Sequence, residues 1–391
     1  MVSFWVICMA CLCRIRFSAG ERVVKHTHFL PASGFHGEER QRQLQTGDVY
    51  LWWGRHLKKP LKHKRLMKRA YWHCLFWLLV VLAGSGYALA GYATFSRFLS
   101  HDRYSGVMTT AFLVGVPFST CALISYYLSL KRQASLKKVA LTCLGSLFLA
   151  IFLCFAIFRE GGICILLFLG IAVLPGVLGV VLGTAMATVW RNAHRTLMSV
   201  VAILPLAFGG VEQQVPPQDV FHETDRSVFI KAPPEVVWRN ILHPTNIRPG
   251  ELAEGYAYKI GVPYPVEATV VEPKVGGIRK STWQRGVHFD EEITALKKDR
   301  YIEWIYHFTD ASFPPGSLDD HVKVGGTYFD LTDTSYTLRP ADGGTYLDLS
   351  VRYRVTTTFN WYAVPVARFF IGDTASTLLH FYKERSERRT S

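Results

Sequence analysis

The sequence has 391 residues, of which 49% are hydrophobic and 19% charged, and its formal net charge is +14. So apolar a composition excludes a disordered chain, a collagen-like chain and a small disulfide scaffold, and it indicates a membrane protein with a soluble part attached. The positive charge lies in residues 1–211, whereas residues 212–391 carry a net charge of −3, which argues against a basic nucleic-acid-binding domain.

The N-terminal stretch, residues 1–66, lacks the pattern of a folded domain. Its first 13 residues are apolar, but no basic residue precedes them, which makes a poor signal peptide. Cys8, Cys11 and Cys13 form a cluster, yet a zinc site needs about four ligands and no matching cluster follows, so we expect no metal. We expect this basic extension to be disordered or, if translation begins at Met67, absent from the native protein.

Five apolar segments follow within a predicted transmembrane region at 67–215. The first four have the roughly 20 residues that a helix needs to cross ~30 Å of hydrocarbon. The fifth has only 15 residues and contains Pro205, so it either spans the bilayer or lies at its interface; we predict that it spans. The segments are 73–95, 107–130, 139–158, 163–189 and 197–211.

The predicted spans themselves are free of charge at their centres, which argues against a transporter or proton pump. Small residues recur four positions apart, as Gly84 and Ala88 and as Gly179, Gly183 and Ala187. Because this spacing places them on one helix face, we expect close packing within the bundle.

The loops between the spans predict the orientation. Fourteen basic residues lie before the first span, between the second and third, and between the fourth and fifth, against three on the other side. Basic loops stay in the cytoplasm, so the N-terminus should be cytoplasmic in the cell (inner) membrane. Five spans then place the C-terminal domain outside the cytoplasm and four place it inside, and we predict the extracytoplasmic side.

The C-terminal domain, residues 216–391, is long enough for one real core. The strand 227–231 precedes a helix that begins near Pro234 and ends at His243-Pro244, and a second short helix is expected to start near 249–251. A long amphipathic helix from Asn360 to Arg385 closes the chain. Six further strands are predicted at 266–272, 278–284, 287–295, 300–308, 331–339 and 345–356.

This order of elements resembles the START-like SRPBCC superfamily, the polyketide cyclase/dehydrase and lipid-transfer relatives. The resemblance is carried by SVFIKAPPEVVWRNI at 227–241, by the strand series, and by NWYAVPVARFFIGDTASTLLHFYKERSE at 360–387. It implies an α+β helix-grip domain behind an all-α transmembrane helix bundle, an arrangement familiar in bacteria. It also implies a cavity between sheet and helix for a lipid, sterol-like or polyketide-like ligand, but it identifies a fold rather than a chemistry.

Aromatic and aliphatic side chains on the inward faces are the expected lining of that cavity. The last strand alternates strictly between apolar and polar residues, and the hairpin strand before it alternates likewise. The predicted lining residues are Trp304, Tyr306, Leu349, Val351, Tyr353, Phe370 and Leu378.

Glu291 is the one candidate catalytic residue. It falls on the face of its strand that carries Val287, Phe289 and Ile293, where a carboxylate would be desolvated and could act as an acid, a base or a ligand anchor. The alternative is a bulge or a shift by one residue that turns Glu291 outward and puts Glu292 in its place. The sequence leaves both interpretations open.

The segment 309–327 is long for a hairpin loop and is expected to turn over the cavity mouth. It contains Asp319, Asp320 and His321, of which we assign the last two to the mouth. Three adjacent residues in an extended strand cannot all face one ion, so we expect no metal here. Asp373 in the closing helix is expected to be solvated.

We therefore expect membrane-anchored, non-enzymatic binding of a hydrophobic small molecule or lipid, with the bilayer and an apolar ligand as partners and no cofactor. One alternative is a cyclase- or dehydratase-like enzyme that uses Glu291 as its base. The other is a module that docks a partner protein through its acidic surface.

Overall fold

The computed structural model describes residues 59–100, 104–130, 135–158, 162–189, 195–319 and 321–388. The three clustered cysteines and Asp320 lie outside these residues, as does the extension as far as residue 58. The chain divides into two compact units, residues 1–79 and 80–391. The site described below belongs to the second unit.

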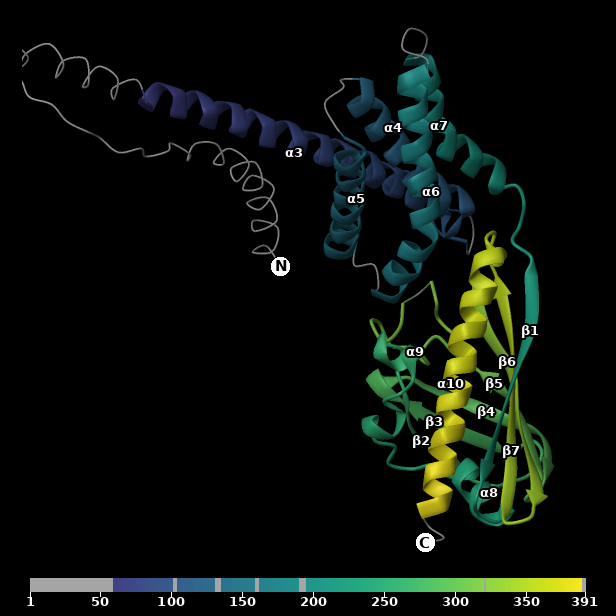
Figure 1. Ribbon diagram of the computed structural model, residues 1–391. Helices are drawn as coiled ribbons and strands as arrows, with labels where there is room; N and C mark the ends of the chain where they lie inside the picture. The colour runs from purple at the N-terminus through teal and green to yellow at the C-terminus, as the bar shows by residue number, and fades with distance from the viewer. Residues whose placement is uncertain are drawn as a thin grey trace, which may run out of the picture. The chain divides into compact units, whose positions relative to one another are not determined.

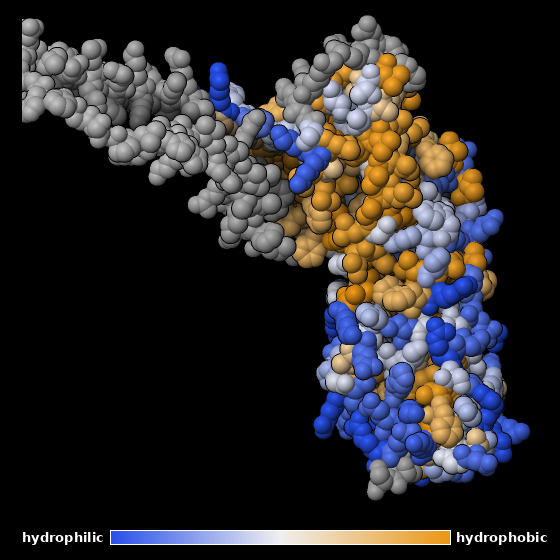
Figure 2. All heavy atoms as spheres, viewed as in Figure 1, coloured by the Kyte–Doolittle hydropathy of each residue, from blue (hydrophilic) through white to orange (hydrophobic). Residues whose placement is uncertain are grey.

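The described part of the N-terminal half is helical. Four of its helices are long and apolar enough to cross a membrane: Lys68–Phe98, Ala111–Leu130, Leu136–Ile157 and Gly162–Val189; a fifth apolar helix, Leu197–Glu212, is shorter. Figure 2 shows apolar side chains gathered over these helices, whereas the visible face of the sheet domain is largely hydrophilic. The bounds are α3 Lys59–Phe98, α4 Val116–Leu130 after a π-helical turn at Ala111–Gly115, α5 Leu136–Leu153, α6 Gly162–Val189 and α7 Arg195–Glu212.

The first helix begins earlier than predicted. Residues 59–66, which we assigned to a disordered extension, form the start of α3. Pro60 stands in the first turn of this helix, where proline is tolerated, and the Lys, Arg and Leu residues that follow it are good helix formers. The change from basic to apolar residues therefore marks no helix boundary.

Glycines bring α6 close to α4, as the small-residue spacing predicted. A Cβ atom at Gly179 would overlap the Phe118 carbonyl oxygen, and one at Gly183 would overlap the Ala122 carbonyl oxygen. The absent side chains thus let the two backbones touch within the bundle.

Helix α7 packs along α4 in the opposite direction. The Ser119 hydroxyl donates to the Val201 carbonyl at 2.8 Å. At the C-terminal end of α7, the Glu212 carboxylate accepts hydrogen bonds from the backbone N–H groups of Thr110 and Ala111, both at 2.8 Å. The end of α7 therefore meets the start of the second apolar helix.

The C-terminal domain is a seven-stranded sheet in the order β1-β7-β6-β5-β4-β3-β2, antiparallel throughout. Figure 1 shows the long helix α10 running across one face of this sheet, as in the helix-grip fold that the resemblance implied. The strands are β1 Asp219–Ile230, β2 Pro265–Val270, β3 Ile278–Trp283, β4 His288–Lys297, β5 Tyr301–His307, β6 Phe329–Ala341 and β7 Gly344–Thr356.

The helices of this domain also follow the predicted order. They are α8 Pro234–Leu242, a 3-10 turn at Pro249–Leu252, α9 Tyr256–Lys259 and α10 Asn360–Arg388. The hydrophobic core lies between the sheet, α8 and α10 and includes Ile241, Ile302, Leu347 and Leu379, each at most 2% exposed. The main difference is β1, which starts at Asp219 and so is longer than the predicted strand, because all twelve of its residues pair with β7.

Candidate functional site

A cavity of about 140 Å³ lies between the inner face of the sheet and α10. An engineered apolar cavity of about 150 Å³ is large enough to bind benzene, so this one accommodates roughly a single ring. Its walls are mostly apolar. Side chains from β3 to β7 and from α10 line it, among them Arg279, Ser281, Trp283, Glu291, Trp304, Tyr306, Thr334, Leu349, Val351, Thr374, Ala375, Leu378 and Tyr382.

Inside this apolar wall lies one buried ion pair. Arg279 on β3 and Glu291 on β4 are direct cross-strand partners, and their side chains are 6% and 5% exposed. An Arg279 Nη1 group donates to the Glu291 carboxylate, and the Ser281 hydroxyl donates to the same carboxylate at 2.9 Å. The guanidinium also reaches the Ile241 carbonyl at 3.4 Å. A charged pair is thus buried with hydrogen bonds that offset part of its desolvation cost.

The position of a bulge explains why Glu291 points inward. The pairing of β4 with β5 shifts between Ile293 and Ala295, after Glu291 rather than before it. Phe289, Glu291 and Ile293 are therefore all buried, whereas Glu292 faces outward and pairs with His307 at 2.8 Å. Of the two interpretations that the sequence left open, the structure has the inward one.

Burial governs the electrostatics of the site. It raises the pKa of the Glu291 carboxyl, and the Arg279 guanidinium and the Ser281 hydroxyl oppose this only in part. Burial likewise raises the pKa of Tyr306, assisted by the nearby Glu291 carboxylate. The Tyr306 and Thr334 hydroxyls lie 2.7 Å apart in a hydrogen bond. The tyrosines of the cavity are therefore neutral hydrogen-bonding groups.

Trp304 links the ion pair to the aromatic wall. Its ring lies 4.7 Å from the Arg279 guanidinium carbon, a cation–π contact, and 5.4 Å from the Tyr336 ring. Trp304 thus joins the buried ion pair to the aromatic residues of the sheet.

The loop between β5 and β6 closes another side of the cavity. Phe313, Leu318 and Val324 from this loop line it and pack with the aromatic side chains of β4 and β5. The loop is tied at one point by Arg285, whose Nη1 donates to the Ser317 carbonyl at 3.1 Å. The loop therefore contributes apolar side chains to the cavity wall, and its place over a cavity mouth stays a prediction.

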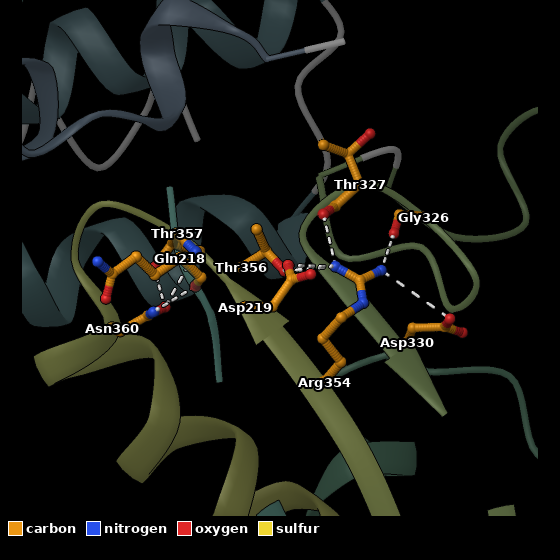
Figure 3. Close-up of polar contacts among 9 residues, drawn as sticks. All are labelled: Gln218, Asp219, Gly326, Thr327, Asp330, Arg354, Thr356, Thr357 and Asn360. Atoms are coloured by element: carbon orange, nitrogen blue, oxygen red, sulfur yellow. Dashed lines mark hydrogen bonds and ion pairs between the residues drawn. The ribbon is translucent and has the colours of Figure 1, made fainter. Parts of the chain in front are cut away.

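Arg354 on β7 holds the end of this loop (Figure 3). Its guanidinium donates to the carbonyls of Thr327 at 3.2 Å and Gly326 at 2.9 Å, and it also pairs with Asp219 at 3.5 Å and Asp330 at 3.9 Å. Nearby, the Asn360 side chain accepts from the Thr357 backbone N–H at 2.9 Å and donates to the Gln218 carbonyl at 3.0 Å. These contacts join the loop, the start of β1 and the start of α10.

Five of the seven predicted lining residues lie at the cavity: Trp304, Tyr306, Leu349, Val351 and Leu378. Tyr353 is fully buried but lies farther along β7, with its ring 6.0 Å from Phe329. Phe370 falls beside the inward stripe of α10 and contacts Phe369 instead. Neither belongs to the lining, because the inner faces of β7 and α10 extend beyond the cavity.

The polar candidates have structural contacts. The His321 ring contacts Tyr328 edge-on at 6.2 Å, and His321 does not line the cavity. The Asp373 carboxylate is not simply solvated, because it accepts from the Ala257 backbone N–H at 3.1 Å, at the start of α9. Among the described residues, no three His, Cys, Asp or Glu side chains lie together as a metal site would need.

The sequence interpretation missed Arg279 and Ser281. Neither face of the predicted strand 278–284 is apolar, so the alternation of side chains along the strand could not show which face points into the core. The usable signal is the hairpin register: the turn spans Gln284–Gly286, and Trp283 donates to the Val287 carbonyl at 2.7 Å. A three-residue turn pairs Arg279 with Glu291, whereas the predicted two-residue connection pairs Lys280 with it.

No family model matches this sequence, and no curated protein matches it. Among solved structures, a Thermus thermophilus protein is 18% identical, with 44% of this chain and 100% of that chain covered and a TM-score of 0.29. The Zhui aromatase/cyclase of a Streptomyces species is 14% identical over 44% of this chain and 97% of that one, with a TM-score of 0.28. A Staphylococcus aureus protein of unknown function is 12% identical over 44% and 98%, with a TM-score of 0.29. Each of these three structures covers less than half of this chain.

Proposed function

We propose that this protein is a membrane-anchored receptor or carrier for a hydrophobic small molecule or lipid, which it holds in the cavity between its sheet and α10. The main support for this proposal is the cavity itself, which has a volume of about 140 Å³ and a mostly apolar wall. Protein interiors are close-packed, and an empty space of this size forfeits packing energy that a bound apolar ligand would restore.

The size of the cavity sets the ligand class. At about 140 Å³ it takes one ring or a short acyl segment. A drug-sized ligand needs roughly 300–1,000 Å³, so a whole lipid tail requires the β5–β6 loop or α10 to move outward. Phe313, Leu318 and Val324 are the side chains that such a movement would displace.

The membrane helices support delivery of the ligand from a bilayer. Within the described ranges, four helices are long and apolar enough to span it. We also propose that α7 spans, although at about 1.5 Å per residue its 18 residues reach only ~27 Å. Two observations support this. α7 runs antiparallel to α4, and its C-terminal residue Glu212 binds the backbone of Thr110. Thr110 precedes the second apolar helix, whereas the basic segment 131–138 follows it, so the end of α7 lies at the side away from that basic segment. Five spans put the C-terminal domain on the extracytoplasmic side.

Mass spectrometry of small molecules co-purifying with the full chain tests the binding proposal. Thr374→Phe places a ring in the cavity from α10, and His380→Phe places the same ring on the exposed side of that helix. We expect an apolar molecule with the native chain and with His380→Phe, and its loss with Thr374→Phe. Equal amounts in all three would show that the molecule sits elsewhere, for example on the apolar helices.

A second candidate function is acid–base catalysis by Glu291, as in a cyclase or dehydratase. The observation in its favour is a carboxyl group that lines the cavity and whose pKa is raised by burial. An argument against catalysis is that Arg279 and Ser281 already donate hydrogen bonds to the Glu291 carboxylate. Glu291→Gln should abolish turnover of a bound ligand without weakening its binding if this role is real. Docking of a partner protein is the third candidate, and a cavity found collapsed in solution would favour it.

A further inference from the structure

The start of α10 is packed into the membrane bundle. Phe359, directly before the helix, is 5% exposed and belongs to the bundle core together with Phe112. The Tyr362 hydroxyl donates to the Leu167 carbonyl of α6 at 2.8 Å, and a Cβ atom at Gly170 would overlap that hydroxyl. The helix that bounds the cavity is therefore held directly against α6.

The length of α6 places this contact at the level of the lipid headgroups. Its 28 residues reach about 42 Å at ~1.5 Å per residue, whereas the hydrocarbon layer is ~30 Å thick. When α6 is centred in the bilayer, each end projects about 6 Å beyond the hydrocarbon. Leu167 lies five residues after Gly162, about 7.5 Å along the axis, and so stands at the boundary of hydrocarbon and headgroups. The first turn of α10 is level with it.

The exposed face of α10 changes along the helix. Trp361 in the first turn is 64% exposed. Pro365 and Arg368 are exposed one and two turns later, and the spacing of four and seven residues places all three on one face. Near the other end of the helix, the exposed side chains include His380 and Glu384. An aromatic and basic face near the bundle thus gives way to an ordinary polar one.

Tryptophan and arginine suit the headgroup layer. Trp is enriched at membrane–water interfaces because its apolar ring carries an N–H group that hydrogen-bonds to headgroups and water. No acidic side chain pairs with Arg368 among the residues that the structure describes, so its guanidinium is available to a lipid phosphate. A long arginine side chain can lie along apolar surface while its charged end reaches the headgroups.

We propose that this face of α10, formed by Trp361, Pro365 and Arg368, binds the headgroup layer of the bilayer that the apolar helices span. Trp361 places its ring at the interface, and Arg368 binds a phosphate group of a phospholipid. The bilayer is the occupant because the face continues directly from α6. Since Thr374 and Leu378 of the same helix line the cavity, the cavity is bounded by a helix seated on lipid. The inference goes beyond the proposed function, because it needs the membrane anchor but no ligand in the cavity.

Fluorine NMR of the full chain, labelled with 5-fluorotryptophan in phosphatidylcholine nanodiscs, tests this contact. Trp361→Phe assigns the resonance. The lipid carries a nitroxide on its headgroup, and a soluble gadolinium chelate probes access from water. The control is His380→Trp, which puts the same reporter on an exposed position of the same helix, ~28 Å farther along it.

We expect the nitroxide lipid to abolish the Trp361 resonance and to leave the resonance at position 380 in place. The gadolinium chelate should broaden the latter more than the former. Broadening of Trp361 by the chelate and not by the lipid would overturn the proposal. Protection from both would overturn it too, by showing that a second copy or another protein covers this face. If spin-labelled lipid broadened no tryptophan resonance, the membrane anchor itself would be overturned.

A second comparison isolates the phosphate contact. The nitroxide is moved to a minor phosphatidylglycerol component, and Arg368→Gln is compared with Arg388→Gln at the far, exposed end of α10. One basic residue near an anionic surface is worth about 1 kcal/mol, so Arg368→Gln should lower the broadening of Trp361 about fivefold. Arg388→Gln should leave it unchanged. Equal broadening in the two variants would overturn the role of Arg368 while leaving the Trp361 contact intact.

Discussion

Replacing Arg279 with methionine should destabilise the domain in a manner that depends on pH. Methionine is unbranched and removes the charge, so Glu291, 4% exposed, keeps only the Ser281 hydroxyl as a polar partner at 2.9 Å. An isolated carboxylate in such a place neutralises rather than stays charged. The folded variant therefore holds Glu291 protonated at neutral pH, while the unfolded chain ionises it.

The magnitude follows from that proton. An ordinary Glu has a pKa of about 4.3 and each pH unit is worth ~1.36 kcal/mol, so holding the proton at pH 7 costs at most ~3.7 kcal/mol. Because the folded-state pKa of Glu291 is raised above the unfolded value, its contribution to stability is intact at acid pH and is lost as the pH rises. The native chain has a smaller effect of the same sign, since Arg279 lowers the pKa that burial raises.

Urea denaturation of the full chain in a mild detergent, followed by tryptophan fluorescence at pH 5, 6 and 7, measures this. The deficit of Arg279→Met should grow by up to ~1.4 kcal/mol per pH unit. Arg279→Met combined with Glu291→Leu should recover most of the lost stability, as replacement of buried ion pairs by apolar residues often does. Arg339→Met removes the exposed partner of Asp348 on the same sheet and should show no such growth. A deficit of the Arg279 variant that is equal at pH 5 and pH 7 would refute the reasoning.

Three further predictions concern contacts outside the cavity. Arg385 lowers the pKa of the Glu251 carboxyl by hydrogen bonding. The pair therefore stabilises the fold above the ordinary glutamate pKa, and that stability is lost as the pH falls through the lowered pKa. Glu251→Gln should lower the free energy of unfolding by about 1 kcal/mol at pH 7 and should weaken the fall of the melting temperature at acid pH. Arg354→Gln should speed hydrogen exchange in residues 309–328 while β4 and β5 exchange as before, and unchanged exchange in the loop would contradict its role as the tie seen in Figure 3. Gly183→Leu should lower the melting temperature in detergent strongly, because the side chain overlaps a backbone carbonyl of α4; a neutral outcome would argue against that helix contact.

Much of the fold could be predicted because its patterns are local. The alternation of Leu347, Leu349 and Val351 predicted the buried face of β7, and these residues are 0%, 1% and 9% exposed. The four longest apolar runs likewise became the four long helices. The predicted start of the first helix was wrong because the helix continues from the apolar residues into the basic ones. The predicted length of the first strand was wrong because its additional residues form a strand only by pairing with β7.

The site was less predictable because it depends on register across strands. Glu291 was found from the pattern of its own strand, whereas Arg279 joins it only when the turn at Gln284–Gly286 is known to have three residues. The lining of α10 was predicted at Leu378 but was missed at Ala375 and Tyr382. A helix stripe is known from sequence only to about one residue on either side, and which part of it faces an empty space is a property of the assembled core.

The central claim, that an apolar molecule occupies the cavity, is tested most directly by a fluorine NMR titration of the full chain labelled with 5-fluorotryptophan. Trp304 lines the cavity, whereas Trp238 is also buried in the core but does not line it. Titration with acetophenone should shift the Trp304 resonance saturably and leave the Trp238 resonance in place. A shift of both resonances in proportion to the added probe, or of neither, would contradict the account.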